Sequence, residues 1–243
     1  MRFVPNFGSA VGGYPARAMA PSTAKRRARK QHGPKPTLVL FVRHGQTPTT
    51  GQDLPGRTAG LHLADKGREQ ADLAAARIAE LGDGRVAAVY ASPLERTLET
   101  AAPIAKACGV RVHRRAGLLE LDVGEWTGRP LKELAKLPEW RTVQRYPSGF
   151  RFPGGESFAE MQTRVSGTVD HLRVAHPGQT IVCVSHADPI RALVAHAMGT
   201  HLDLFQRIVV SPCSITAILY GSEGPVVLTV NSTGGSLREL APA

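Results

Sequence analysis

Three apolar runs in this sequence stop abruptly at polar side chains. A continuous apolar run of five to seven residues is typical of a strand buried on both faces of a parallel sheet. The buried strands that this pattern predicts are Thr37–Val42, Val86–Tyr90 and Gln179–Ser185. The polar residues that directly follow them are Arg43 and His44, then the segment Ser92–Arg96, and then His186.

Amphipathic segments separate these strands. Apolar residues at helical spacing predict helices over residues 64–81, 93–107, 156–175 and 189–198, the second capped by Ser92 with Pro93 in its first turn. Short strands are predicted at 110–112, 214–220 and 226–231, and residues 114–155 predict loops around a short helix near 131–136. The alternation predicts an α/β fold: a single-domain three-layer sandwich with a mostly parallel central sheet and helices on both faces.

The charge of the chain is unevenly placed. The 243 residues hold 30 Lys and Arg against 20 Asp and Glu, a formal net charge of +10. Residues 1–36 contribute eight basic side chains and no acidic one, whereas residues 37–243 hold 22 basic and 20 acidic side chains. We therefore interpret residues 1–36 as a basic, disordered extension and residues 37–243 as the folded domain. Binding to nucleic acid is expected, if at all, only through the extension.

Other compositional signals exclude several classes of protein. No apolar run approaches the roughly 18 residues of a membrane span, and the basic start lacks the apolar segment of a secretory signal. Three cysteines far apart in the sequence predict neither a disulfide framework nor a zinc ribbon. We expect a cytoplasmic protein with no metal site and no cofactor; a homodimer remains open.

The polar residues after the buried strands predict one common site. In open α/β sheets ligands bind outside the carboxyl ends of the strands, so Arg43, His44, Arg96 and His186 are expected to be neighbours. Arginine offers planar forks that match phosphate oxygens, and histidine adds a further hydrogen-bond donor. The sequence therefore predicts a pocket for an anion.

Five motifs in order resemble those of the histidine phosphatase superfamily, the phosphoglycerate mutase-like proteins of branch 1. The match runs from about residue 38 to 232, and the stretch after Trp126 is similar to a subgroup named for phosphomutases. The motifs are Arg43-His44-Gly45-Gln46-Thr47, the helix start Leu63–Ala71, Ser92-Pro93-Leu94-Glu95-Arg96-Thr97, the loop Leu119–Gly128, and Val184-Ser185-His186.

The resemblance implies a role for each residue at the predicted pocket. His44 would attack phosphorus and form a covalent phosphohistidine. Arg43, Arg96 and His186 would hold the phosphoryl oxygens and stabilise their charge. Glu120 would protonate the leaving oxygen and then activate water, with Asp122 and Glu125 as rivals for that role. Further phosphate or substrate contacts are expected at Gln46, Thr47, Arg57, Gly155, Glu156 and Ala187. Capping of the following helix is an equal alternative for Glu156 and its neighbour Ser157.

Three functions remain to be separated. The favoured one is a phosphomonoester hydrolase that acts on a small molecule. A phosphoglycerate-type mutase would use the same pocket, but the mutases of this family carry a longer basic insertion than residues 127–155 offer here. The third is a non-enzymatic protein that binds anions or is tethered by its basic extension.

Overall fold

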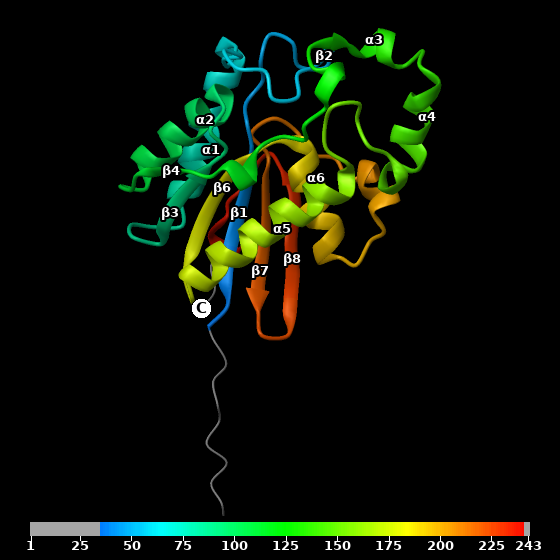
Figure 1. Cartoon of the computed structure of the whole chain (residues 1–243). Helices are drawn as coiled ribbons and strands as arrows, with labels where there is room; N and C mark the ends of the chain where they lie inside the picture. The colour runs from blue at the N-terminus through cyan, green and yellow to red at the C-terminus, as the bar shows by residue number, and fades with distance from the viewer. Residues whose placement is uncertain (1–34, 241–243) are drawn as a thin grey trace, which may run out of the picture. The chain divides into compact units, whose positions relative to one another are not determined.

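The computed structural model describes residues 35–240. These form a central sheet with helices on both faces (Figure 1), so the predicted three-layer α/β architecture is confirmed. The predicted extension, residues 1–36, lies almost wholly outside the described residues. The strands of the main sheet are β1 (Thr37–Arg43), β3 (Val86–Ala91), β4 (Val112–Arg114), β6 (Thr180–Ser185), β7 (Ile215–Gly221) and β8 (Gly224–Ser232).

The sheet is parallel where the site is expected and antiparallel at one edge. Its order is β4-β3-β6-β1-β7-β8, with parallel pairs from β4 to β1 and antiparallel pairs from β1 to β8. Strands β1, β3 and β6 therefore lie side by side, with their carboxyl ends at one edge. Those ends carry the polar residues that the sequence analysis singled out.

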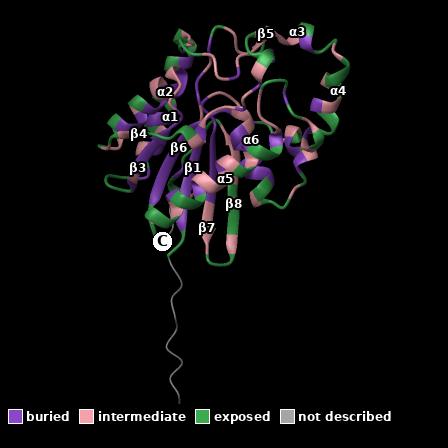
Figure 2. Ribbon diagram, in the orientation of Figure 1, coloured by how far each residue is buried: buried purple, intermediate pink, exposed green. Residues whose placement is uncertain are grey.

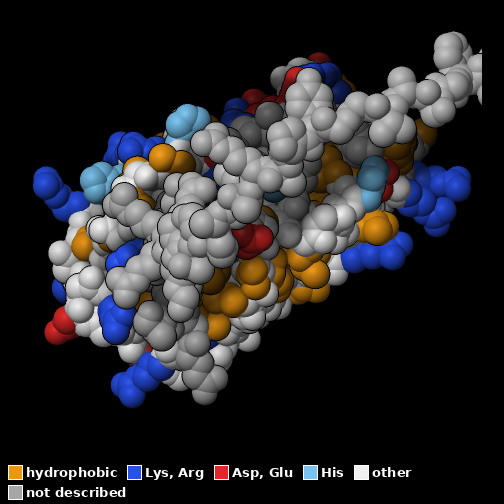
Figure 3. Space-filling model, turned by 90° about the horizontal axis from the view of Figure 1, so that it is seen from below, with side chains coloured by type: hydrophobic (Ala, Val, Ile, Leu, Met, Phe, Trp, Pro, Cys, Tyr) orange, Lys and Arg blue, Asp and Glu red, His pale blue; other side chains and the backbone are white. Residues whose placement is uncertain are grey.

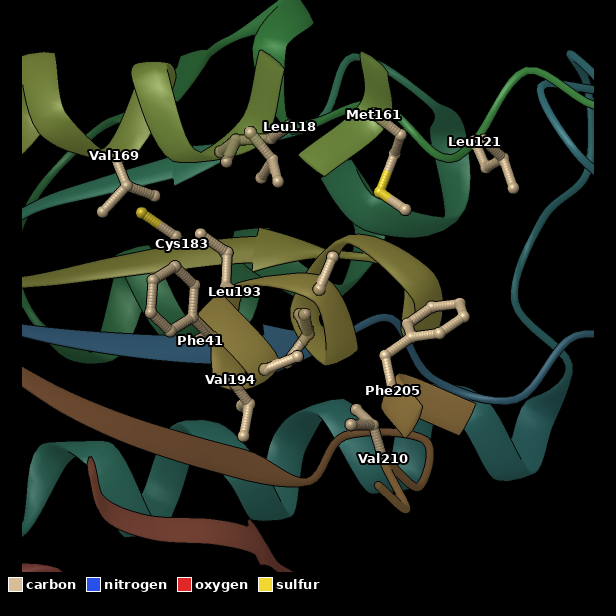
Figure 4. Packing of buried hydrophobic residues seen from close by; sticks show 14 of the residues in the cluster. Phe41, Leu118, Leu121, Met161, Val169, Cys183, Leu193, Val194, Phe205 and Val210 are labelled. Atoms are coloured by element: carbon tan, nitrogen blue, oxygen red, sulfur yellow. The ribbon is translucent and has the colours of Figure 1, made fainter. Parts of the chain in front are cut away.

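Alternation along the central strands divides the core into two layers. In β1, Leu38, Leu40 and Val42 pack with α1 (Asp65–Ala79) and α2 (Glu95–Ala107). Val39 and Phe41 face α5 (Phe158–Ala175) and α6 (Ala187–Ala197) instead. Figure 4 shows the second layer, in which Phe41 and Cys183 of the sheet face Val169 of α5 and Leu193 of α6. Both faces of β1 are buried, as Figure 2 also shows.

The region between β4 and α5 holds several short elements. The structure confirms the short helix near residue 131 and adds α4, which the sequence analysis missed. The elements are the 3₁₀ helices Ala116–Leu118 and Gly124–Trp126, the strands β2 (Asp53–Leu54) and β5 (Arg129–Pro130) that pair with each other, α3 (Leu131–Leu134), α4 (Pro138–Arg145) and the 3₁₀ helix Pro147–Gly149. Two further 3₁₀ helices are Leu202–Arg207 and Arg238–Leu240.

The predicted start of α2 is wrong by two residues. The N-cap is Leu94, and Ser92 lies before the helix. The Ser92 hydroxyl is engaged with His186, 2.9 Å away, and its carbonyl accepts a hydrogen bond from the Thr97 hydroxyl. A serine with such long-range partners is not free to cap the helix. By contrast, Ser157 caps α5 in a capping box with Glu160.

Figure 3 shows the end of the molecule opposite the carboxyl ends of β1 and β6, where Lys and Arg side chains and apolar side chains are both visible at the surface. None of the helices within residues 35–240 is long and apolar enough to cross a membrane.

Candidate active site

His44 stands just past the end of β1. Its backbone N–H donates to the Ser185 carbonyl of β6, and its side chain is only 5% exposed. The Nδ1 atom lies 2.8 Å from the Gly45 carbonyl, which can only accept a hydrogen bond. We therefore assign the ring proton to Nδ1, which leaves the lone pair of Nε2 free. Burial, with Arg96 and Arg43 nearby, lowers the pKa of His44 to about 3, so the ring is neutral near pH 7.

A close backbone contact holds the segment after His44 in place. A Cβ atom on Gly45 would come within 2.4 Å of the Gly67 carbonyl oxygen in α1, which only glycine avoids. The Gly45 N–H donates to the Thr100 hydroxyl of α2, which itself donates to the Arg96 carbonyl. The chain around His44 is thus fixed by both α1 and α2.

Two arginines lie beside the histidine, each with an unused donor. Arg96 is fully buried and donates from Nη2 to the Gly56 carbonyl at 2.7 Å, while Arg43 donates from Nη1 to the Val210 carbonyl at 2.7 Å. The Nε atoms of both arginines are buried without a hydrogen-bond partner. Burial lowers the pKa of both guanidinium groups, but arginine stays charged at any physiological pH.

His186 completes the polar cluster from the end of β6. Its ring centroid lies 5.2 Å from that of His44, and its Nε2 lies 2.9 Å from the Ser92 hydroxyl. Its Nδ1 is buried without a partner. Burial and the positive charge of Arg96 hold its pKa well below the usual range. We assign the proton of the neutral ring to Nδ1, where it is available to a ligand, with the Ser92 hydroxyl as the donor to Nε2.

These four side chains (Arg43, His44, Arg96 and His186) suit an anion, and we call them the phosphate pocket for the ligand that we propose below. Three of the buried nitrogens in the described part of the chain that lack a partner belong to this pocket: Arg43 Nε, Arg96 Nε and His186 Nδ1. Leaving a buried donor unpaired costs about 1–3 kcal/mol, more when it is charged. An anion that bound all three would remove that cost.

Glu120 lies in the acid loop, which we define as residues 119–123. Its Oε1 accepts a hydrogen bond from the Leu121 N–H at 2.9 Å. Burial, with the negative charge of Asp188, raises its pKa to about 7, despite the opposing effect of Arg96 and Arg43. A carboxyl group with this pKa is present in both protonation states near neutral pH, which suits a group that gives and then takes a proton.

The two rivals of Glu120 are placed differently. Asp122 forms an ion pair with Arg57 at 3.2 Å and accepts a hydrogen bond from the Gly124 N–H. Glu125 is exposed to solvent. Arg43 and Arg96 lie close enough to act on Glu120, whereas Asp122 is paired with Arg57 and Glu125 is exposed, so the placement favours the residue that the sequence resemblance indicates.

The other residues predicted to contact the phosphate or substrate fall into two groups. Gln46 and Thr47 follow His44, and Ala187 is the first residue of α6, directly after His186. The backbone N–H of Gln46 donates to Gln70 Oε1, and that of Thr47 to the Thr50 hydroxyl. Arg57 and Glu156 form hydrogen bonds with the acid loop, and the Gly155 backbone packs against the Asp122 carbonyl.

Sequence reasoning missed some residues around the site. Thr100 and Arg164 were not singled out, yet Thr100 supports Gly45 and Arg164 binds the acid loop. Thr100 follows Arg96 by one helical turn, so its position on the same face of α2 could have been predicted. Arg164 gave no signal, because an arginine within an amphipathic helix is ordinarily solvated.

The described residues contain no group of three or more His, Cys, Asp or Glu side chains that could hold a metal ion. Cys108, Cys183 and Cys213 are free thiols. The side chains that meet at this site are two neutral imidazoles, two guanidinium groups and a carboxyl group whose pKa is near 7.

Comparison with known proteins gives the same family along the whole described body. The sequence pattern of the histidine phosphatase superfamily (branch 1) matches residues 39–233. Phosphoserine phosphatase 1 of Hydrogenobacter thermophilus is 34% identical over 200 residues, 80% of this chain and 92% of that protein. A probable phosphoglycerate mutase of Cronobacter sakazakii is 33% identical over 211 residues, 84% of this chain and 96% of its own.

A solved structure agrees with these relatives. A mutant phosphoserine phosphatase of Entamoeba histolytica, in complex with phosphoserine, matches with a TM-score of 0.73 and 27% identity, over 81% of this chain and 98% of that one. The family pattern covers most of the chain and includes all four residues of the phosphate pocket. The chain belongs to the histidine phosphatase superfamily (branch 1).

Proposed function

We propose that this protein hydrolyses a small phosphomonoester through a covalent phosphohistidine on His44. Like its relatives, which are phosphatases and phosphoglycerate mutases, the chain is an enzyme that acts on phosphomonoesters. The observation that carries the proposal is the set of buried, unpartnered nitrogens on Arg43, Arg96 and His186 beside a neutral His44. They match the phosphoryl oxygens that such a reaction must hold.

In the first step, Nε2 of His44 attacks phosphorus while the bond from phosphorus to the leaving oxygen breaks. Protonated Glu120 gives its proton to that oxygen, so the alcohol leaves uncharged. Arg43 and Arg96 neutralise the charge that builds on the phosphoryl oxygens, and His186 donates a further hydrogen bond. The Nδ1–H of His44 bonded to the Gly45 carbonyl stabilises the positive ring that forms.

In the second step, water attacks the phosphohistidine and the bond from Nε2 to phosphorus breaks. Ionised Glu120 takes a proton from the water, and inorganic phosphate leaves. The carboxyl group is then protonated again and the ring is neutral, as at the start. A pKa of about 7 lets Glu120 serve in both steps near neutral pH.

A phosphoglycerate-type mutase is the second candidate, because a probable phosphoglycerate mutase is 33% identical over 84% of this chain. Its second step would return the phosphoryl group to a substrate molecule rather than to water. We favour hydrolysis because residues 127–155 form a short insertion, and because the phosphoserine phosphatase of Hydrogenobacter thermophilus is similarly close. Metal independence, a cytoplasmic location and a homodimer remain predictions.

The first test is phosphate release from p-nitrophenyl phosphate in the presence of a chelator. Wild type should turn over and His44→Ala should not; equal turnover by the two proteins would refute the mechanism. The second test supplies 3-phosphoglycerate with a trace of 2,3-bisphosphoglycerate. Hydrolysis predicts that phosphate release outpaces isomerisation, and faster isomerisation would establish the mutase instead.

A further inference from the structure

Arg57 directs three nitrogens at the region that carries the acid. Its Nε donates to the Glu120 carbonyl at 2.9 Å, its Nη1 to Asp122 Oδ2 at 3.2 Å and its Nη2 to Glu156 Oε2 at 2.8 Å. The planar fork thus joins the backbone of the acid residue to two carboxylates. A guanidinium with three such partners is held in one orientation.

Arg164 of α5 contacts the same backbone from another side. Its Nη1 donates to the carbonyls of Gly117 and Leu119, each at 3.0 Å, and its Nη2 reaches the Glu120 carbonyl at 3.3 Å. The Glu120 carbonyl therefore accepts hydrogen bonds from two arginines. Neither arginine contacts the Glu120 carboxyl group itself.

Glu156 joins the two arginines. Its Oε1 accepts from Arg164 Nε at 2.8 Å, and its Oε2 accepts from Arg164 Nη2 and Arg57 Nη2, each at 2.8 Å, and from the Asp122 N–H at 3.1 Å. Although burial raises the pKa of Glu156, the hydrogen bonds from Arg164 and the Asp122 backbone outweigh burial and lower the pKa. The group is ionised and fully engaged with protein donors.

The phosphate pocket is tied to the same residues through Arg96. This arginine donates from Nη2 to the Gly56 carbonyl at 2.7 Å and from Nη1 to the Thr58 carbonyl at 3.3 Å. These carbonyls flank Arg57 in the chain. Arg96 is therefore hydrogen-bonded to the backbone on both sides of Arg57, and the Arg57 side chain is hydrogen-bonded to the backbone of Glu120.

We propose that Arg57 is a positioning residue that, with Arg164 and Glu156, holds the Glu120 carboxyl group at the leaving oxygen in a position set by Arg96. This replaces the substrate contact that the sequence predicts for Arg57 and Glu156. The inference rests on the proposed function, because it assumes that Glu120 is the acid. Displacement of a catalytic group by about 1 Å can cost on the order of 100-fold in rate.

The choice of leaving group separates positioning of the acid from contact with phosphate. An alkyl phosphate needs a proton on its departing oxygen, whereas p-nitrophenolate leaves readily without one. The value of kcat/KM covers the steps up to departure of the leaving group. A variant with a displaced acid should therefore lose kcat/KM for the alkyl ester far more than for the aryl ester.

The experiment compares Arg57→Ala with Glu120→Gln on an alkyl phosphate and p-nitrophenyl phosphate, with inorganic phosphate as a competitive inhibitor. We expect Arg57→Ala to lose about 10- to 100-fold in kcat/KM on the alkyl ester and much less on the aryl ester. Its inhibition constant for phosphate should change by less than about twofold, because Arg57 makes no contact with the phosphate in this account. The matched control is Arg173→Ala, whose side chain pairs with Asp170 within α5 rather than with the acid loop and should leave both esters unchanged.

Arg57→Lys keeps the test decisive where Arg57→Ala folds poorly, and a double variant provides a second check. Arg57→Lys retains the positive charge but not the planar fork, so its kcat/KM on the alkyl ester should fall nearly as far as that of Arg57→Ala. If Arg57 instead neutralised the phosphate, lysine should restore most of the activity. In the Glu120→Gln background, Arg57→Ala should lower kcat/KM on the alkyl ester by less than about a further threefold, because the acid that Arg57 positions is already absent.

The outcomes distinguish this inference from the function on which it rests. Equal losses on both esters, with weaker inhibition by phosphate, would overturn the positioning role and make Arg57 a phosphate contact. If Glu120→Gln lowers kcat/KM equally on both esters, then Glu120 is not the acid, and the proposed mechanism is wrong independently of Arg57. If Glu120→Gln discriminates between the esters and Arg57→Ala does not, only the positioning role is wrong.

Discussion

The phosphate pocket and the acid loop are built in different ways. Arg43, His44 and His186 project from the ends of two adjacent parallel strands, and Arg96 lies in the first turn of the helix that follows a third. Glu120 instead belongs to a segment with no regular structure between two 3₁₀ helices. Side chains hold this segment: Arg57 and Arg164 bind its carbonyls, and the Ser185 hydroxyl of β6 donates to the neighbouring Leu118 carbonyl at 2.7 Å.

The difference separates two tasks. Binding a phosphoryl group requires donors in fixed places, and strands and helices place side chains more precisely than loops do. Delivering a proton requires a carboxyl group held at the leaving oxygen, which differs from one substrate to another. Loss of the pocket should therefore affect every substrate alike, whereas changes around the acid loop should depend on the leaving group.

The largest effect is expected at His44. His44→Ala removes the attacking nitrogen, so turnover of alkyl and aryl esters should both fall by at least about 10³-fold. Steady-state assays on the two esters measure this, with circular dichroism to verify the fold. Retention of more than about a tenth of the wild-type rate on either ester would mean that another group attacks phosphorus.

Arg43→Lys should give the next largest loss on the aryl ester and should be indifferent to the leaving group. Lysine keeps the charge but loses the planar fork, and Arg43 makes no hydrogen bond to the acid loop. We expect kcat/KM to fall by about 100-fold on both esters, with weaker inhibition by inorganic phosphate. A loss confined to the alkyl ester would contradict the division between pocket and loop.

Glu120→Gln should separate the two esters. Amide in place of carboxyl leaves the size unchanged but removes the proton donor, so kcat/KM for an alkyl phosphate should fall by about 10²–10⁴-fold. The value of kcat/KM for the aryl ester should fall by less than about tenfold, because its leaving group needs no proton. The decisive quantity is the ratio of the two losses, and a ratio near one would remove Glu120 from the role of acid.

The pH dependence of the alkyl ester follows from the raised pKa of Glu120. The active form of the acid is protonated, and its pKa is about 7, so the advantage of wild type over Glu120→Gln in kcat/KM should shrink above pH 7, by about tenfold per pH unit. The ratio of the two proteins cancels ionisation of the substrate itself. His44, with a pKa of about 3, should impose no acid limb down to about pH 4. An advantage that grows above pH 7 would contradict the assignment.

Ser157→Ala should have the smallest effect, although Ser157 follows Glu156 directly. Loss of the capping box costs about 1 kcal/mol of stability. Thermal unfolding should therefore shift by a few degrees while kcat/KM on both esters stays within about twofold. A selective loss on the alkyl ester would show that the acid loop depends on the start of α5 and not only on the arginines.

The same contrast explains what could be predicted from the sequence. The apolar runs before His44 and His186 defined their strands, and parallel strands bring their carboxyl ends together, so the neighbourhood of these residues was predictable. The surroundings of Glu120 were not, because Arg57 and Arg164 reach it from distant segments and their partners depend on tertiary placement. The prediction of Ser92 as the N-cap of α2 was wrong for a similar reason, because the Ser92 hydroxyl has a long-range partner in His186.

Helix α4 shows a second limit of prediction from the sequence. It spans only Pro138–Arg145, with Val143 as its one buried residue, so its apolar periodicity is too short to detect. Its proline in the first turn and the following Glu139 are the start signals that could have identified it.

The central claim, a covalent intermediate on His44, can be tested directly by rapid quenching. Wild type mixed with p-nitrophenyl phosphate and quenched in base, where phosphohistidine survives, should contain one phosphoryl group per active site during turnover. Mass spectrometry of the digested protein should place that group on His44, and it should decay at the rate at which phosphate appears. Turnover without any phosphorylated peptide, or a phosphoryl group on another residue, would contradict the account.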